Sequence, residues 1–199
     1  MAVVDVNYKF IMIDVGSYGK NSDGGVLEHS EFGKLLYMKK LDLPQPKAIV
    51  ENSTELFPFV LVGDEAFRLS ENLMKPYPRR DLDEMKRRYN YHLSYTRQVV
   101  ECTFGILTAK FRIFDTNIAI HPTKVDKVIK AACVLHNLIR VEEGDMYNSE
   151  SIDTAGGAFE PITNICRLNK NQSTRTAREI RDKFCNYFSG AGAEEWQDD

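Results

Sequence analysis

The segment that most restricts the fold is an uninterrupted apolar run over residues 59–62, Phe-Val-Leu-Val, which leads into Gly63, Asp64 and Glu65. A short run of this kind predicts a β-strand covered on both faces, because a strand with one face in water alternates apolar and polar residues. The carboxyl ends of such strands are favoured ligand sites in open α/β sheets. Asp64 is therefore the first candidate for a functional residue.

A β-hairpin is predicted at the start of the chain. Residues 2–6 and 10–15 are short runs rich in β-branched and apolar side chains, and residues 7–9 join them. Two such runs with so short a connection are typical of antiparallel strands joined by a tight turn. With the strand at residues 59–62, the hairpin predicts the strands of an α/β fold.

Helical spacing of apolar residues is found in most of the remaining chain. It predicts four helices, over about residues 26–38, 82–111, 123–141 and 173–188. The apolar face expected on the third of them comprises Val125, Val128, Ile129, Ala132, Leu135 and Leu138. Either Ser22 or Asp23 is expected to cap the first helix, and either Ser173 or Thr174 the last. Residues 41–56, with two prolines and little periodicity, predict a surface loop.

Composition and charge limit the possible functions. The chain has 199 residues, of which 43% are hydrophobic, and this is enough for one domain with a core. Its formal net charge of -3 gives no overall sign of nucleic-acid binding, so that function must depend on local basic clusters. Four cysteines lie far apart without metal-ligand spacing, which argues against a zinc site and fits an intracellular protein. No apolar run reaches the roughly 18 residues of a membrane helix, so we expect a soluble protein of the nucleus or cytoplasm.

Two carboxylates in separate predicted elements are candidate metal ligands. Asp64 ends a predicted strand, and Glu101 lies on a predicted helix next to its apolar stripe, where an unpaired charge is costly. Nucleases that use two cations need carboxylates that converge from separate elements, and carboxylate oxygens suit Mg²⁺ or Mn²⁺. Two other interpretations remain open, with Asp64 as a helix cap and Glu101 as the intrahelical partner of Arg97.

Basic residues gather between residues 79 and 112 and alternate there with tyrosines. The candidate DNA contacts among them are Arg87, Arg88, Arg97, Lys110 and Arg112. The neighbouring tyrosines are Tyr77, Tyr89, Tyr91 and Tyr95. Such a mixture suits a phosphate backbone, although a solvated helix face also explains runs of this kind.

Cys133 and His136 also lie close together, three residues apart on one predicted helix. We interpret them as packing and hydrogen-bonding groups rather than as a catalytic or metal-binding pair. The chain contains no G-x-S-x-G, P-loop or dinucleotide fingerprint, which disfavours serine hydrolases and nucleotide-dependent enzymes of those types.

Several segments, in order along nearly the whole chain, carry a resemblance to a known family. They are VVDVNYKFIMIDVGSYGKNSDGGV, FVLVGDEAF with LMKPYP, YNYHLSYTRQVVECTFGILTAKFRIF and AACVLHNLIR. Together they resemble the PIF/Harbinger transposases and the nucleases that hosts have domesticated from them. The C-terminal STRTAREIRDKFCNYF is similar to the tails of animal members.

The resemblance implies an RNase H-like fold, in which a mixed sheet flanked by helices presents acidic residues for DNA strand cleavage. Matched motif by motif, Asp64 corresponds to the second catalytic aspartate and Glu101 to the catalytic glutamate. Asp23 corresponds to a further acidic residue and is a third candidate metal ligand. The resemblance also implies Mg²⁺ or Mn²⁺ as cofactor, DNA and a separate DNA-binding protein as partners, no membrane association, and a nuclear location.

The chain departs from the family pattern at its N-terminus, where the first strand and its catalytic aspartate are expected before residue 1. We therefore expect a partial RNase H-like nuclease domain over residues 1–141, a loose linker over 142–172, and a C-terminal helix with an acidic tail over 173–199. Three functions remain open: a metal-dependent endonuclease, an inactive module that binds DNA or protein, and a non-functional fragment of a transposase.

Overall fold

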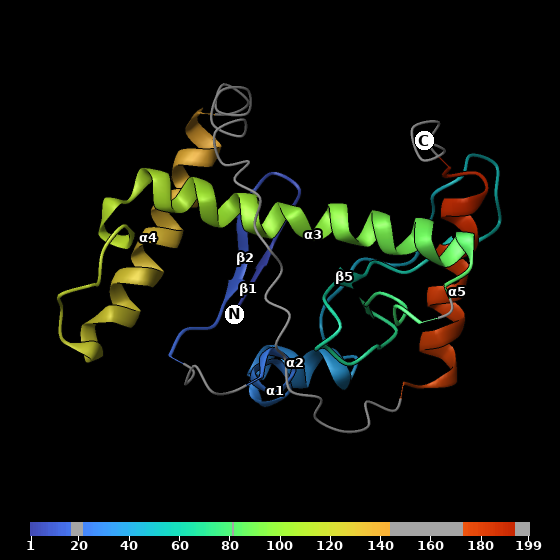
Figure 1. The fold of residues 1–199 in the computed structure, drawn as a ribbon, viewed down its shortest axis with the longest axis horizontal. Coiled ribbons are helices and arrows are strands. Elements are labelled where there is room, and N and C mark those ends of the chain that lie inside the picture. The colour runs from blue at the N-terminus through green and yellow to red at the C-terminus, as the bar shows by residue number, and fades with distance from the viewer. Residues whose placement is uncertain (17–21, 81, 144–172, 194–199) are drawn as a thin grey trace. The chain divides into compact units, whose positions relative to one another are not determined.

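The computed structural model describes residues 1–16, 22–80, 82–143 and 173–193. Residues 144–172 of the linker expected over 142–172, and residues 194–199 of the expected C-terminal segment, lie outside these residues. The chain forms two compact units. The first combines Met1–Asn21 with Gln98–Asn164, and the second combines Ser22–Arg97 with Ile165–Asp199. Figure 1 shows the elements in chain order from blue to red.

The first unit contains the predicted hairpin, now as strands β1 (Ala2–Val4) and β2 (Phe10–Ile13). The strands pair in antiparallel register, with Ala2 opposite Ile13 and an irregularity after Val3. The turn is closed by Asp5, whose carboxylate accepts hydrogen bonds from the backbone N–H groups of Asn7 and Lys9. The hairpin prediction is confirmed.

Helix α4 (Pro122–Glu143) covers the hairpin together with the C-terminal part of α3 (Glu84–Lys110). A short 3₁₀ turn, η1 (Arg112–Phe114), follows α3. The core between these elements consists of the buried residues Phe10, Leu107, Ala132 and Cys133. Burying one side of each helix against the hairpin excludes water from this apolar surface, which stabilises the unit.

The buried face of α4 agrees with the expected one at Ala132, which is buried, and differs from it further along the helix. His136 is buried there, whereas Leu135 and Leu138 are 47% and 55% exposed. The reason lies in the polar partners of the hairpin, because the Asn137 side chain bonds both backbone groups of Phe10, at 2.8 Å each. Because these backbone groups need hydrogen-bond partners, the face of α4 that carries Asn137 packs against the hairpin, and the face that carries Leu135 and Leu138 does not.

The interpretation of Cys133 and His136 as packing and hydrogen-bonding groups is confirmed. Both side chains are buried, and His136 Nε2 lies 2.7 Å from the Tyr8 carbonyl oxygen. Tyr8 has a φ of 59°, a left-handed conformation that is unfavourable for a residue with a Cβ. The guanidinium of Arg140 stacks over the Tyr8 ring at 5.5 Å and donates from Nε to the Asn7 carbonyl. Helix α4 thus holds the turn of the hairpin in place.

In the second unit, the single helix expected over residues 26–38 is two helices, α1 (Asp23–His29) and α2 (Glu31–Tyr37). Ser30 breaks the run because its backbone is extended (ψ 153°) and its hydroxyl accepts a hydrogen bond from the Gly33 N–H. Gly33 is needed at this corner, since a Cβ there would lie 1.7 Å from the Leu27 carbonyl oxygen. Ser22 is the N-cap of α1, which settles one of the two expected choices.

The loop expected over residues 41–56 contains two short strands, β3 (Lys47–Ala48) and β4 (Leu56–Phe57), which pair antiparallel. The strand expected over 59–62 is shorter, as β5 (Leu61–Val62), because Phe59 is 44% exposed and its carbonyl bonds the Asn72 side chain. It pairs in parallel with β6 (Leu73–Met74), which the sequence analysis missed.

The described strands form three separate two-stranded sheets, whereas a single mixed sheet was expected. The α/β character is confirmed, in a mostly helical chain with small sheets.

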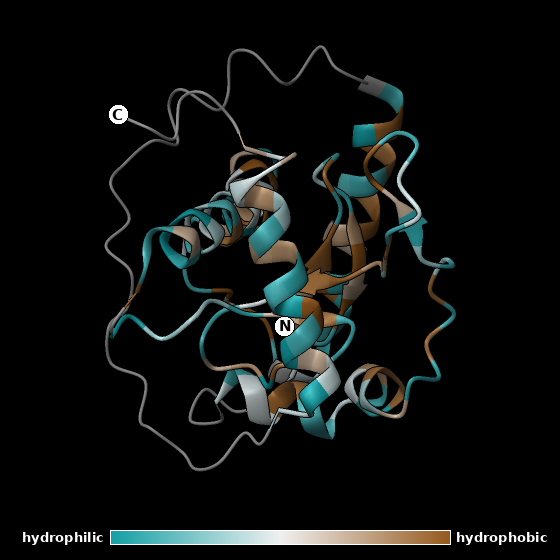
Figure 2. Cartoon of the chain, turned by 90° about the vertical axis from the view of Figure 1, so that its right-hand side faces the viewer, coloured by the Kyte–Doolittle hydropathy of each residue, from teal (hydrophilic) through white to brown (hydrophobic). Residues whose placement is uncertain are grey.

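Helix α5 (Arg175–Ser189), capped by Thr174, shares the core of the second unit. Its Ala177 and Cys185 are buried with Leu69, Met74, Tyr77, Tyr89 and Leu93. The Tyr77 hydroxyl donates a 2.5 Å hydrogen bond to Asp182. Hydrophilic and hydrophobic residues alternate along the helices in Figure 2, as expected where one side of a helix packs on a core. Within the described residues no helix has the length and apolar character to cross a membrane.

Candidate metal site

Asp64 lies in a tight turn directly after β5. Gly63 continues the pairing with β6, since its N–H donates to the Met74 carbonyl at 2.9 Å. The Asp64 carboxylate accepts a 2.8 Å hydrogen bond from the Ala66 N–H through Oδ1. The carboxylate therefore caps a turn rather than a helix, and only one of its oxygens is used for this purpose.

Two glycines allow neighbouring groups to pack closely around this turn. A Cβ at Gly63 would lie 2.7 Å from the Phe67 ring, and a Cβ at Gly24 would lie 2.4 Å from the Ala66 carbonyl oxygen. Helix α1 thus contacts the backbone of the turn directly. The lack of a side chain at both positions lets the turn sit against its neighbours without strain.

Lys75, the first residue after β6, bonds the same turn. Its Nζ donates to the carbonyl oxygens of Glu65 at 2.9 Å and Phe67 at 2.8 Å. Burial, and then the nearby charge of Arg181, lower the pKa of Lys75, while Glu65 and Asp64 act in the opposite direction. These contacts of Lys75 were not expected from the sequence. The signal available was a lysine directly after an apolar pair, in LMKPYP.

The second carboxylate oxygen of Asp64 lies near the guanidinium group of Arg97. Oδ2 lies 4.0 Å from a terminal nitrogen of Arg97 on α3, and the two side chains are 25% and 37% exposed. Arg97 thus interacts with Asp64, although the sequence had suggested Glu101 as its partner. A partly exposed pair at this distance contributes little to stability, about 1 kcal/mol at most.

Glu101 belongs to the first unit and differs from expectation in its surroundings. Its side chain is exposed, and it makes no hydrogen bond or ion pair with any residue that the structure describes. The expected cost of an unpaired carboxylate beside the apolar stripe does not arise, because solvent reaches the group. The residues buried on this part of the helix are Thr103, Ile106 and Leu107.

Asp23 is exposed in the first turn of α1, immediately before Gly24. A carboxylate at this position interacts favourably with the partial positive charge of a helix N-terminus, and this explains its presence without a ligand. Across the described residues, no group of three His, Cys, Asp or Glu side chains could hold a metal ion.

The candidate DNA contacts are not equally accessible. Arg87 and Arg112 are exposed, whereas Arg88, Arg97 and Lys110 are partly buried. Arg88 pairs with Glu84 at 3.0 Å, and Arg112 lies 3.9 Å from Asp115. Among the neighbouring tyrosines, Tyr77 and Tyr89 are core residues, while Tyr91 and Tyr95 are 50% and 64% exposed. Only the last two could stack on a nucleic-acid base.

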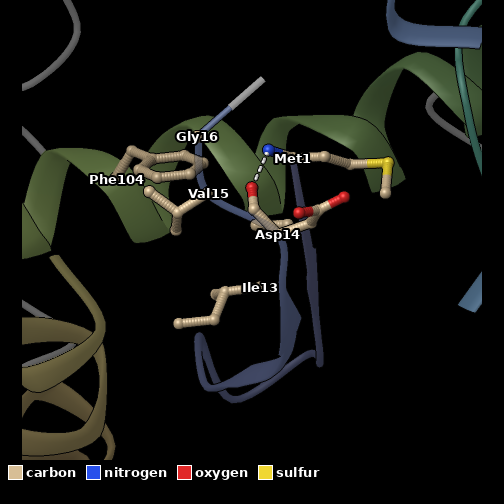
Figure 3. A pocket seen from close by; sticks show the side chains of 7 residues that line it. Met1, Ile13, Asp14, Val15, Gly16 and Phe104 are labelled. Carbon is tan, nitrogen blue, oxygen red and sulfur yellow. Dashed lines mark hydrogen bonds between the residues drawn. The ribbon is translucent and has the colours of Figure 1, made fainter. Parts of the chain in front are cut away.

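A hollow of about 230 Å³ lies in the first unit, at the end of the hairpin. Figure 3 shows Met1, Asp14 and Phe104 among its lining residues, with the Met1 amino group 2.7 Å from the Asp14 carbonyl oxygen. None of the three carboxylates predicted as metal ligands lines it.

A carboxylate oxygen is the donor type that Mg²⁺ or Mn²⁺ prefers, and Asp64 offers one at Oδ2. The guanidinium of Arg97 lies 4.0 Å from Oδ2, and its positive charge would compete with a divalent cation for this oxygen. Asp64 would supply one ligand of such a cation. The described residues do not provide a complete set around it.

Residues 1–137 match the model of the DDE superfamily endonucleases. The chain belongs to this family, which confirms the resemblance derived from its motifs.

Two relatives show how far the likeness extends. A protein named "Protein ALP1-like" from Arabidopsis thaliana is 25% identical over 191 residues, which covers 96% of this chain and 46% of that protein. The protein named "Putative nuclease HARBI1" is 36% identical in both Homo sapiens and Bos taurus over 95 residues, covering 45% of this chain and 26% of theirs. The chain thus spans less than half the length of these relatives. No solved structure matches it significantly.

Proposed function

We propose that the chain contributes to a divalent-metal-dependent DNA endonuclease, with Asp64 and Glu101 as metal ligands and Asp23 as a further candidate. The observation that carries this proposal is the match of residues 1–137 to an endonuclease family, combined with a carboxylate held in a defined turn at a strand end. The proposed architecture is that of an RNase H-like nuclease, and the proposed location is the nucleus.

Mg²⁺ or Mn²⁺ bound at these carboxylates would supply a Lewis acid for attack of water on a DNA phosphodiester. The residues of the chain would hold the metal ligand Asp64 and the DNA backbone in position. The turn would hold Asp64 through the Ala66 N–H, which bonds Oδ1 and leaves Oδ2 as the oxygen that could bind the cation. Exposed Arg87 and Arg112 would contact the phosphate backbone, with the partly buried Arg88, Arg97 and Lys110 adding positive charge.

Nicking of supercoiled plasmid DNA tests the proposal. We expect nicking that requires Mg²⁺ or Mn²⁺ and disappears in Asp64→Asn and in Glu101→Gln. Asp42→Asn is the matched control, since Asp42 is an exposed aspartate of the second unit outside the turn. Metal-dependent nicking that survives both site changes would contradict the assignment.

A second candidate function is that of a module that binds DNA without cleaving it. A separate DNA-binding protein would be its partner. The exposure of Arg87 and Arg112 favours it, because these side chains can reach phosphates without a metal. DNA binding that weakens steeply with salt, in a protein that does not nick DNA with either metal, would support this function over the first.

A further inference from the structure

Helix α4 has a second apolar face, on the side away from the hairpin. Four aliphatic side chains on this side are between 47% and 67% exposed. They are Val134, Leu135, Leu138 and Val141. Single apolar residues on a surface need no explanation, but a contiguous row of them marks a contact surface, because a partner that packs on it removes the apolar area from water.

The exposed face has the spacing by which two helices pair. Its residues alternate steps of three and four positions along α4, and all of them belong to the first unit. They are Lys124, Lys127, Ala131, Val134, Leu138 and Val141. This spacing places side chains in one line along a helix, and the side chains of two such lines interdigitate when the helices pack together. The face therefore suits another helix as its partner.

Charges at the two ends of this face are opposite in sign. Lys124, Lys127 and Lys130 are exposed in the first half of α4, and Glu142 is exposed near its end. None of these four side chains forms an ion pair with another residue of the described ranges. Lysine near a helix N-terminus and glutamate near a C-terminus are the reverse of what the helix dipole favours. A second helix that runs in the opposite direction would bring opposite charge to both ends.

We propose that this face of α4 pairs with the same face in a second copy of the chain, with the two helices antiparallel. Such a contact has a twofold axis, so each pairing occurs twice. With the axis between residues 134 and 135, Ala131 faces the partner's Leu138, and Lys127 faces the partner's Glu142. A parallel pair would place Lys127 beside the partner's Lys127, where like charges repel.

The charges also distinguish a second copy from a nucleic acid. A phosphate backbone would suit the three lysines, but the other half of the face is an apolar row that ends in Glu142. The same helix, reversed, matches both halves. This inference does not depend on the proposed nuclease activity or on a metal ion.

Sedimentation equilibrium of the whole chain tests the proposal. One helix face per copy is a small interface, so we expect a weak dimer whose fraction rises with protein concentration. Leu138→Glu should weaken the dimer at least about tenfold, because it places a charge within the apolar row. Leu35→Glu is the matched control, since Leu35 is an exposed leucine of α2, and it should leave the dimer fraction unchanged.

An exchange of charges tests the direction of pairing. Lys127→Glu should weaken the dimer roughly three- to tenfold at low salt, because both copies lose an ion pair. Lys127→Glu combined with Glu142→Lys should restore most of the affinity, since the same pairs form with their signs exchanged. Urea unfolding at a low protein concentration shows whether each variant keeps its fold. If Leu138→Glu does not, Val134→Lys, at a 67% exposed position, takes its place.

Monomer at every concentration up to about 1 mM would overturn the proposal and leave this face to a segment of a different protein. A dimer of the same affinity in Leu138→Glu would also overturn it, because another surface would then form the contact. A dimer that Leu138→Glu weakens but that the charge exchange does not restore would contradict the antiparallel pairing.

Discussion

The side-chain amide of Asn137 bonds both backbone groups of Phe10, as a neighbouring strand would. It accepts a hydrogen bond from the Phe10 N–H and donates one to the Phe10 carbonyl oxygen, at 2.8 Å each. The two residues are 127 positions apart in the sequence. Asn90 repeats this arrangement in the second unit, where its side chain bonds both backbone groups of Tyr77 at 2.8 and 3.0 Å. In both units a helix thus satisfies backbone groups of a segment outside it, and for Phe10 these are groups of a strand in a two-stranded sheet.

Replacing Asn137 with alanine is expected to destabilise the fold by about 2 kcal/mol, because two backbone groups lose their partner. Urea unfolding measures the change. Asn186→Ala removes an exposed asparagine of α5 and should change the free energy of unfolding by no more than about 0.5 kcal/mol. Equal effects of the two substitutions would contradict the role given to Asn137.

His136 should make stability depend on pH. Burial, with a smaller effect of Arg140, lowers its pKa in the folded state, although the Tyr8 carbonyl acts in the opposite direction. The unfolded chain therefore binds a proton more readily, and the stability due to neutral His136 is complete above about pH 6.5 and falls as the pH drops below that value.

His136→Gln keeps a donor for the Tyr8 carbonyl and removes the titration. We expect it to flatten the dependence of unfolding free energy on pH between about 5 and 6.5, as measured by urea unfolding at several pH values. His121→Gln, at an exposed position, should leave the slope unchanged. A slope in His136→Gln as steep as that of the unmodified chain would show that the buried imidazole is not its source.

The bond from Tyr77 to Asp182 should anchor α5. Tyr77→Phe removes a hydrogen bond to a carboxylate and is expected to cost about 1.5–3 kcal/mol. Tyr89→Phe is a close control in the same core, because the buried Tyr89 hydroxyl has no hydrogen-bond partner within the described part of the chain. Thermal unfolding should show a clear loss for the first variant and almost none for the second.

Gly24 should be required for the turn that carries Asp64. A Cβ there would lie 2.4 Å from the backbone oxygen of Ala66, so Gly24→Ala must displace α1 or the turn, at a cost of about 1–3 kcal/mol. In Gly25→Ala the nearest atom is the Ser22 hydroxyl oxygen at 3.1 Å, a side-chain atom that can move. Calorimetry should find Gly24→Ala clearly less stable than Gly25→Ala, and the reverse order would be evidence against this contact.

The spacing of apolar residues predicted those helices and strands that depend mainly on their own sequence. The hairpin and the helices α3, α4 and α5 lie where apolar spacing places them, within a few residues. The break between α1 and α2 was missed because it depends on Ser30 acting as a cap and on the contact of Gly33 with the Leu27 carbonyl. Strand β6 has two residues, too few for any periodicity to show.

The candidate site was predictable to a similar extent. The position of Asp64 after a strand followed from the apolar run at residues 59–62. The exposure of Glu101 did not, since the sequence shows an apolar neighbourhood but not which side of the helix is buried. The hydrogen bond from Lys75 to the Glu65 carbonyl depends on the register of β5 and β6, two strands that are separated by a loop in the sequence. Only the structure shows this register.

Our proposal that Asp64 and Glu101 bind the same cation can be tested directly by loading the chain with Fe²⁺ and generating hydroxyl radicals with ascorbate and peroxide. Radicals formed at a bound ion cut the backbone nearby. We expect cuts next to both Asp64 and Glu101. These cuts should be lost at both places in Asp64→Asn and in Glu101→Gln, and excess Mg²⁺ should suppress them. Cuts next to only one of the two residues, or cuts unaffected by either substitution, would contradict it.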